Sequence, residues 1–235
     1  LISFVLDYFE DKLLPKEKYY ELLSLLILNF KGLSPRELCR GVGISREELV
    51  GFLEVFGVFL LAYGRYLKIT SPSFLGVFLE TRLHDPSVRK TAHARVAAAV
   101  SGGRVSVRSL EEQAHNLLAA GEFFALKQKL APVENFVVLF NEISKFDLFR
   151  FWKRLEERNY DPVQEYNKSF ELFVMHFNPS DEQIFALNLQ FSLFFKELSD
   201  FEGPGTPEFR HPLLLSKVIQ APQNGAARPT PPRVQ

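Results

Sequence analysis

The sequence predicts a mainly α-helical protein that contains one β-hairpin. Three observations support this fold class. Apolar residues recur every three or four positions through most of residues 1–200, helix-start signals are frequent, and one stretch has the composition of paired strands. Apolar residues make up 46% of the 235 residues, so the chain can form a hydrophobic core.

Two kinds of start signal mark the helices. A capping box, in which Ser or Thr precedes Glu or Gln by three positions, satisfies two backbone amides at a helix N-terminus. It occurs at Ser34/Glu37, Ser45/Glu48, Ser109/Glu112 and Ser180/Gln183. A capping residue followed by Pro, the second signal, occurs at Ser34-Pro35, Ser71-Pro72, Asp85-Pro86 and Asp161-Pro162. Together with the periodicity, these signals predict helices near residues 3–14, 17–30, 35–41, 46–56, 72–83, 86–100, 109–119, 122–130, 133–141, 145–157, 162–177 and 181–199.

Residues 58–70, VFLLAYGRYLKIT, interrupt the helical periodicity. Two β-rich runs flank Tyr63-Gly64-Arg65, which predicts a hairpin. Before it, residues 31–57 predict two short helices joined by a tight turn at Gly41-Val42-Gly43, the layout of a helix-turn-helix. The order helix, helix-turn-helix, hairpin, helix is that of a winged helix.

The domain organisation follows from this order. We expect a winged-helix domain over residues 1–100, a weak boundary near Ser101-Gly102-Gly103, and an irregular, repeat-like helical array over 104–200. Residues 201–235 are rich in Pro, Gly and polar residues, which predicts an extended or disordered C-terminal tail. Residue 1 is Leu and periodicity begins at once, so we expect the chain to be a piece of a longer protein.

The charge pattern disfavours nucleic acid as a partner. The chain has 28 basic and 28 acidic residues, whereas nucleic-acid binding normally needs a basic excess or a basic face. The second helix of the helix-turn-helix carries three acids against one base, Arg46, and the wing adds only Arg65 and Lys68. We expect the motif to be a packing unit. The alternative hypothesis is a winged-helix nucleic-acid-binding protein that uses Arg46, Arg65 and Lys68.

The sequence has no recognised pattern for catalysis or cofactor binding. It has no G-x-x-x-x-G-K-[ST] loop, no G-x-G-x-x-G, and no zinc-ligand spacing among one Cys and five His. We therefore expect no enzyme activity, no cofactor, no metal and no small-molecule substrate. The single thiol, Cys39, lies among apolar neighbours and is expected to be buried and inert. An enzyme that uses Cys39 as a nucleophile is a further alternative.

No segment has the roughly 18 to 20 consecutive apolar residues that a membrane helix needs. The N-terminus has neither the basic region nor the cleavage site of a signal peptide. A lone cysteine is typical of a reducing compartment. We therefore expect a cytoplasmic protein that has no membrane partner.

Several motifs occur together in the order known from one family. Residues 23–38 contain L-x-L-L-x-x-x-x-x-G-L-S-x-x-E-L, followed by Leu60 and Gly64 in the hairpin and by Arg82-Leu83. The pattern continues through AHARVAAAV (92–100), SLEEQAHNLLAAGEFFALKQKL (109–130) and FDLFRFWKRL (146–155), which include His93, His115, Leu117, Leu118 and Trp152. In this order, residues 1–200 resemble the winged-helix and helical-arm region of STAND NTPases, in particular NACHT proteins of the nephrocystin-3 and telomerase-associated type.

The resemblance implies a non-catalytic regulatory and scaffolding segment that couples a nucleotide-binding domain to protein-interaction repeats. Its partners would be proteins, including the nucleotide-binding domain of the same chain, which these residues lack. It also implies an association with cilia. Many family members have a His after the wing that reaches the nucleotide phosphate. This chain has Thr70-Ser71-Pro72 there, so direct nucleotide sensing is not expected.

The chain is rich in Phe, with 24 against one Trp. Short helices bury one stripe well, so we expect some aromatic side chains of the array to be exposed as a docking face. The candidates are Phe123, Phe124, Phe146, Phe149, Phe151, Trp152, Phe170, Phe173, Phe191, Phe194 and Phe195. Of these, Phe149, Trp152, Phe194 and Phe195 are the predicted partner-binding residues. His93 and His115 are expected to be hydrogen-bonded core residues.

Overall fold

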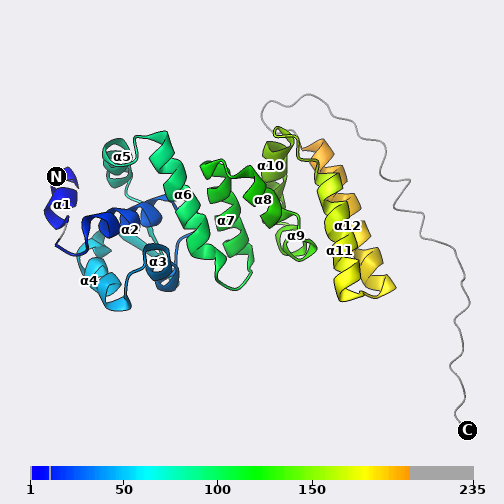
Figure 1. The fold of residues 1–235 in the computed structure, drawn as a ribbon, viewed down its shortest axis with the longest axis horizontal. Coiled ribbons are helices and arrows are strands. Elements are labelled where there is room, and N and C mark those ends of the chain that lie inside the picture. The colour runs from blue at the N-terminus through cyan, green and yellow to red at the C-terminus, as the bar shows by residue number, and fades with distance from the viewer. Residues whose placement is uncertain (1, 11, 202–235) are drawn as a thin grey trace, which may run out of the picture. The chain divides into compact units, whose positions relative to one another are not determined.

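The computed structural model describes residues 2–10 and 12–201 (Figure 1). It is mainly helical and contains a single two-stranded antiparallel hairpin followed by a helical array, which confirms the predicted fold class. The tail predicted over 201–235 lies outside the described residues except for Phe201. None of the helices within the described ranges is both long and apolar enough to cross a membrane.

The elements follow the predicted order closely. In chain order they are α1 (Ile2–Phe9), α2 (Lys16–Leu28), α3 (Pro35–Val42), α4 (Arg46–Phe56), a 3-10 turn (Gly57–Phe59), β1 (Leu60–Tyr63), β2 (Tyr66–Ile69), α5 (Pro72–Thr81), α6 (Pro86–Ser101), α7 (Val107–Ala120), α8 (Phe123–Leu130), α9 (Val133–Leu139), α10 (Lys145–Glu156), α11 (Pro162–Phe177) and α12 (Asp181–Asp200).

Several predicted boundaries differ from the structure by two residues, among them the start of α7, and the largest difference is at the end of α1. The first helix ends at Phe9 rather than near residue 14. The position of Leu14 before Pro15 disfavours helical backbone at Leu14 itself. The helix predicted from residue 109 begins at Val107 instead, because Ser106 is its cap.

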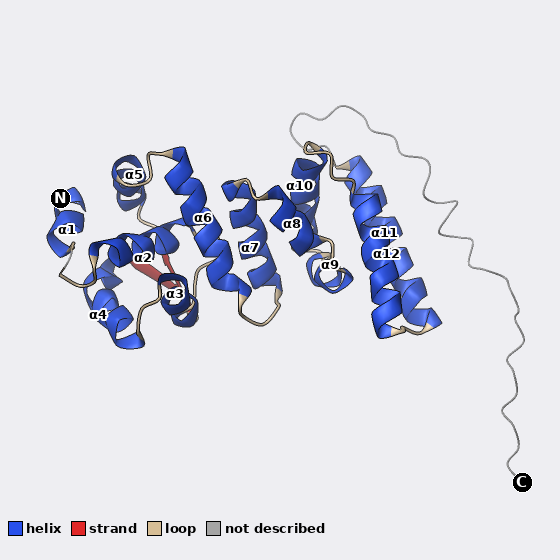
Figure 2. Ribbon diagram, viewed as in Figure 1, coloured by secondary structure: helices blue, strands red, loops and turns tan. Residues whose placement is uncertain are grey.

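The helix-turn-helix and the hairpin share one core. Tyr19 of α2, Phe52 and Phe56 of α4, and Phe74 of α5 are fully buried, and the Phe52 and Phe56 rings stack with centroids 4.6 Å apart. The strands, red in Figure 2, lie next to α2. Their register pairs Leu60 with Ile69 and Tyr63 with Tyr66.

The loop between α2 and α3 joins the same sheet. The Leu33 N–H donates to the Leu67 carbonyl at 3.0 Å, and the Leu67 N–H donates to the Leu33 carbonyl at 2.8 Å. The loop is thereby held beside β2. This places residues 29–33 where the next part of the chain can contact them.

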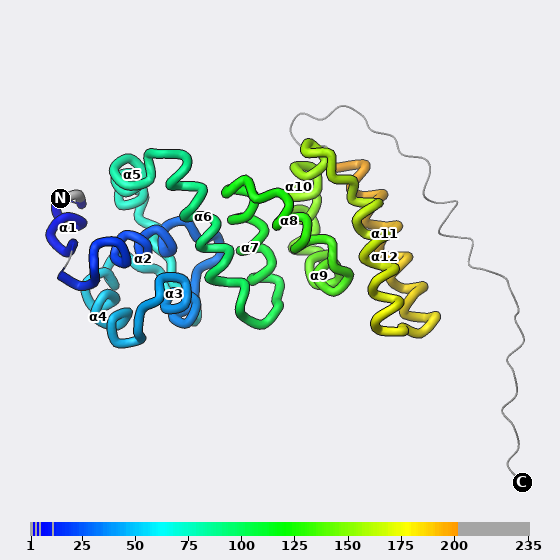
Figure 3. Tube along the Cα trace, in the orientation of Figure 1, coloured from blue at the N-terminus to red at the C-terminus, as the bar shows by residue number. Residues whose placement is uncertain are grey.

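The described chain divides into two compact units, the first ending at His176 and the second beginning at Phe177. Within the first unit, α6 and α7 run side by side and are joined by the turn at 102–106 (Figure 3). The predicted domain limits, 1–100 and 104–200, stay a prediction. Contacts of α7 with the helix-turn-helix nevertheless extend across the expected boundary near Gly102.

The glycines of Gly41-Val42-Gly43 have different roles. Gly43 ends α3 in the left-handed region, at φ 68°, so the tight corner depends on this residue. Gly41 lies inside α3. A Cβ there would be 2.7 Å from Leu25 Cδ1 and 2.8 Å from Ala99 Cβ. The interpretation of Gly41 as part of the turn is therefore wrong, because its missing side chain lets α3 approach α2 and α6.

The close contacts around Gly41 predict that Gly41→Ala and Gly51→Ala have opposite effects on stability. Gly41→Ala is expected to destabilise the protein by about 1 to 3 kcal/mol, as overpacking does. Gly51→Ala in α4 is the control, since a Cβ there meets nothing within 4 Å, and it is expected to stabilise by up to about 1 kcal/mol. Urea unfolding measures both. Equal effects of the two changes would contradict the packing role of Gly41.

Candidate functional site

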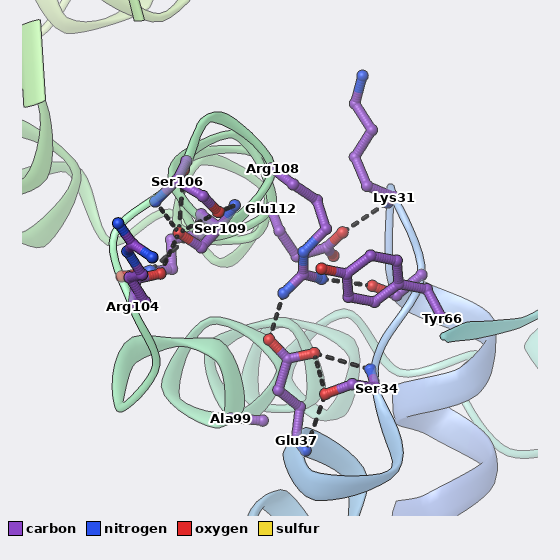
Figure 4. Close-up of polar contacts among 12 residues, drawn as sticks. Lys31, Ser34, Glu37, Tyr66, Ala99, Arg104, Ser106, Arg108, Ser109 and Glu112 are labelled. Carbon is purple, nitrogen blue, oxygen red and sulfur yellow. Dashed lines mark hydrogen bonds and ion pairs between the residues drawn. The ribbon is translucent and has the colours of Figure 1, made fainter. Parts of the chain in front are cut away.

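The first turns of α7 carry polar side chains that contact the α2–α3 loop (Figure 4). The helix begins after Ser106, whose Oγ accepts a hydrogen bond from the Ser109 N–H at 3.2 Å. The Ser109 Oγ in turn accepts one from the Ser106 N–H at 2.8 Å. This reciprocal cap replaces the predicted Ser109/Glu112 capping box. As a result, the Glu112 carboxylate is free to bind another segment.

Glu112 caps the loop after α2 rather than its own helix. Its side chain is fully buried. Oε1 accepts a hydrogen bond from the Phe30 N–H at 2.7 Å, and Oε2 accepts one from the Lys31 N–H at 2.5 Å. Asn116, one turn later on α7, also donates to Oε1 at 2.8 Å. One buried carboxylate therefore binds two consecutive amides that lie about 80 residues earlier in the chain.

Three further polar backbone groups of this loop have partners. The Phe30 carbonyl accepts from Lys68 Nζ of β2 at 3.0 Å, and the Gly32 N–H donates to Asn29 Oδ1 at 2.9 Å. The Gly32 carbonyl accepts from Arg108 Nη1 of α7 at 2.6 Å. Because unpaired buried backbone groups are costly, this pairing specifies one position for the loop.

Arg108 connects α7 to the start of α3. Its guanidinium forms an ion pair with Glu37 and lies over the Tyr66 ring, 4.3 Å from the ring centroid. Glu37 also closes the capping box of α3, because its Oε2 accepts from the Ser34 N–H at 2.7 Å. The carboxylate that caps α3 is thus the one that anchors α7.

Glu111 extends the contact to the later helices. Its Oε2 lies 3.4 Å from Lys31 Nζ, and its Oε1 accepts a hydrogen bond from Ser144 Oγ, before α10, at 2.9 Å. Ser144 is fully buried. We call Arg108, Glu111 and Glu112 together the α7 clamp. It joins α3, the α2–α3 loop, the hairpin and the start of α10.

Two histidines adjoin the clamp. His93 Nδ1 lies 2.8 Å from Asn116 Oδ1, and because an amide oxygen only accepts, Nδ1 carries the proton. The His115 ring stacks on Phe30, with centroids 4.6 Å apart. Burial lowers the pKa of His115, and the neighbouring His93 adds to this effect. Both residues are half-buried and make structural contacts.

Burial also sets the ionisation of Glu112. Desolvation raises the pKa of this carboxyl above its usual value, although the Lys31 and Phe30 amides and Arg108 act in the opposite direction. Desolvation therefore makes the charged form of Glu112 unfavourable in this position. The loop amides and Arg108 reduce this desolvation cost, but the raised pKa shows that they do not cancel it.

The predicted partner-binding residues are mostly buried. Phe149, Trp152 and Phe194 are 1%, 0% and 0% exposed, so a docking role for these three is wrong. Trp152 Nε1 donates to Tyr166 Oη at 2.9 Å, and Tyr166 Oη donates to the Leu130 carbonyl, which places Trp152 in the core of the array. Phe195 is half-buried.

Other aromatic residues of the array do reach the surface, as expected. Phe124 is 58% exposed and Phe146 is 53% exposed. Phe124 and its neighbour Phe123 differ in exposure, since Phe123 is half-buried. The Phe-rich sequence therefore supplies both core and surface positions.

The residues proposed for nucleic acid do not form a basic face. Arg46 and Arg65 are exposed, but Arg65 contacts Tyr66 and Lys68 donates to the Phe30 carbonyl. The exposed side of α4 also carries Glu47 and Glu54. This arrangement would repel a phosphate backbone.

Cys39 is half-buried in α3, and its Sγ lies 3.6 Å from the Ser45 carbonyl. Burial raises the pKa of its thiol, which disfavours the reactive thiolate. Within the described ranges, no group of three or more His, Cys, Asp or Glu side chains is arranged to hold a metal ion.

No protein-family model, no curated protein and no solved structure matches the chain.

The clamp residues were not predicted from the sequence. The sequence offered one signal, the run Ser109-Leu110-Glu111-Glu112-Gln113, in which four of the five residues are polar. The structure shows that all five side chains are buried. Adjacent acids on a helix normally indicate a solvated face. Their partners lie in the α2–α3 loop and at Ser144 before α10, and no local pattern indicates that these segments are close.

Removing the Glu112 carboxylate tests the clamp. Glu112→Ala leaves the part-buried Phe30 and Lys31 amides without their acceptor, and an amide left unpaired away from water costs about 1 to 3 kcal/mol. We expect a loss of about 3 kcal/mol in the free energy of unfolding. Glu54→Ala, on the exposed side of α4, is the control and should change stability by less than about 0.5 kcal/mol. Similar losses for both variants would contradict the role of Glu112.

The raised pKa of Glu112 predicts a pH dependence. Because the pKa of Glu112 is higher in the folded than in the unfolded state, the folded protein holds a proton on this carboxyl that the unfolded chain has already lost. The contribution of Glu112 to the free energy of unfolding is therefore largest below about pH 4.3, the ordinary glutamate pKa. The contribution is lost as the pH rises through the folded pKa. Glu112→Gln removes this titration. The stability of the wild type minus that of Glu112→Gln should fall as the pH rises from 4 towards neutral, measured by urea unfolding. A constant difference would contradict the assignment.

Proposed function

We propose that the chain is a non-catalytic regulatory and scaffolding segment of a STAND-type NTPase. In this role it couples a nucleotide-binding domain to protein-interaction repeats. The observation that carries the proposal is the α7 clamp, which links the helix-turn-helix and its wing to the helical array through polar contacts, including those made by the buried carboxylates of Glu111 and Glu112. The order of motifs in residues 1–200 supports the same assignment.

The clamp supplies a route for such coupling. A partner that displaces the α2–α3 loop would separate the Phe30 and Lys31 amides from Glu112 and leave a buried carboxylate unpaired. The structure would relieve this cost by moving α7, and Glu111 would pass the movement to Ser144 before α10. The loop and the array therefore respond together. The cytoplasm, with an association with cilia, is the location that fits this family.

The full-length protein encoded with this segment provides the test. We expect it to bind ATP through a further domain, and nucleotide to change amide hydrogen exchange in α7 and α10 as well as in the winged helix. Arg108→Ala should reduce the change in α7 and α10. Arg150→Ala, an exposed arginine of α10, is the control and should leave the change intact. A full-length protein without nucleotide binding would contradict the proposal.

The nucleic-acid alternative has a separate test. Because the exposed side of α4 is acidic, we expect no salt-sensitive association with a labelled DNA duplex in fluorescence anisotropy. Salt-sensitive binding that weakens in Arg46→Ala or Arg65→Ala, with the fold intact by circular dichroism, would favour the alternative over the scaffolding role.

A further inference from the structure

Helix α12 has one buried and one exposed apolar face. Phe191 and Phe194 are buried, together with Leu198 further along the same side. The exposed side carries Phe185, Leu189 and Leu193, which are 71%, 53% and 45% exposed. Phe185, Leu189 and Leu193 recur every four positions, so they form one continuous stripe along the helix.

Opposite charges lie at the two ends of this stripe. At about 100° per residue, Glu182, the three apolar residues and Lys196 fall within an arc of about 80°. Glu182 and Lys196 are both exposed, and neither has an ion-pair partner within the described part of the chain. The stripe therefore has the order acid, three apolar residues, base.

This order is symmetric about Leu189 in a way that makes the face self-complementary. Phe185 and Leu193 lie four positions before and after Leu189, and Glu182 and Lys196 lie seven before and after it. In an antiparallel pair of identical helices related by a two-fold axis at Leu189, Phe185 of each copy meets Leu193 of the other. Glu182 of each copy meets Lys196 of the other. A parallel pair would instead oppose acid to acid and base to base.

We propose that the exposed face of α12 is a self-association surface, which pairs antiparallel with α12 of a second copy of this chain. The charge complementarity and the spacing carry this inference, and it does not depend on the proposed function. Three apolar residues per copy bury less area than the roughly 1,200 Å² at the lower end of the range for stable interfaces. The dimer is therefore weak and concentration-dependent.

Charge reversal at the ends of the stripe tests the proposal in the whole chain by sedimentation equilibrium. Glu182→Lys places Lys opposite Lys at both ends of the dimer, and Lys196→Glu places Glu opposite Glu. Each single change is expected to weaken self-association by about tenfold, since two ion pairs become repulsive. The double variant Glu182→Lys/Lys196→Glu restores both pairs and should return to the wild-type dissociation constant. An equimolar mixture of the two single variants should associate more tightly than either alone.

Two further variants control for folding and position. Leu189→Glu places two carboxylates on the two-fold axis and should give a monomer with an unchanged circular dichroism spectrum. Ser199 is exposed and lies outside the 80° arc, so Ser199→Lys should not change association. A wild-type chain that stays monomeric at the highest accessible concentration would overturn the proposal. So would a dimer that survives Leu189→Glu, or a double reversal that fails to restore association, since the two copies would then associate through a different surface.

Discussion

The buried carboxylate of Glu112 is the interaction on which the arrangement of the first unit depends. It binds the Phe30 and Lys31 amides at 2.7 and 2.5 Å from a fully buried position. Taking a charge out of water is expensive, and the partners reduce the cost most when they are all in place. Such a contact adds less to stability than an apolar one of the same size would. It instead makes one position of α7 against the loop much better than any other.

The clamp links elements whose local structure is set independently. Helix α3 is capped by Ser34 and Glu37, α7 by Ser106 and Ser109, and both caps form within a few residues. Glu37 then serves twice, as a cap for α3 and as the ion-pair partner of Arg108. A movement of α7 that shifts Arg108 therefore also disturbs Glu37 at the N-terminus of α3, where the helix-turn-helix begins.

Most of the fold could be predicted because its signals are local. The caps at Ser34, Ser45 and Ser180 and the hairpin turn at Gly64 lie within four residues of what they determine, and the structure confirms them. The clamp could not be predicted, since its partners are 33 to 82 residues apart. The Ser109/Glu112 pattern matched the capping box, but Ser106 was an equally good cap. The tertiary contact of Glu112 decided between the two.

Burial of the aromatic residues shows the same limit. Helical spacing groups Phe149 and Trp152 on one side of α10, but spacing alone does not say whether that side meets solvent or another helix. The deciding contact is Trp152 with Tyr166, a residue on another helix whose hydroxyl also reaches the Leu130 carbonyl. A polar atom on each ring has a buried partner, which fixes that side as core. In α12 the same reasoning gives the opposite result for Phe185, Leu189 and Leu193: their side chains are exposed, so a symmetric pattern of charges around them is free to select a partner.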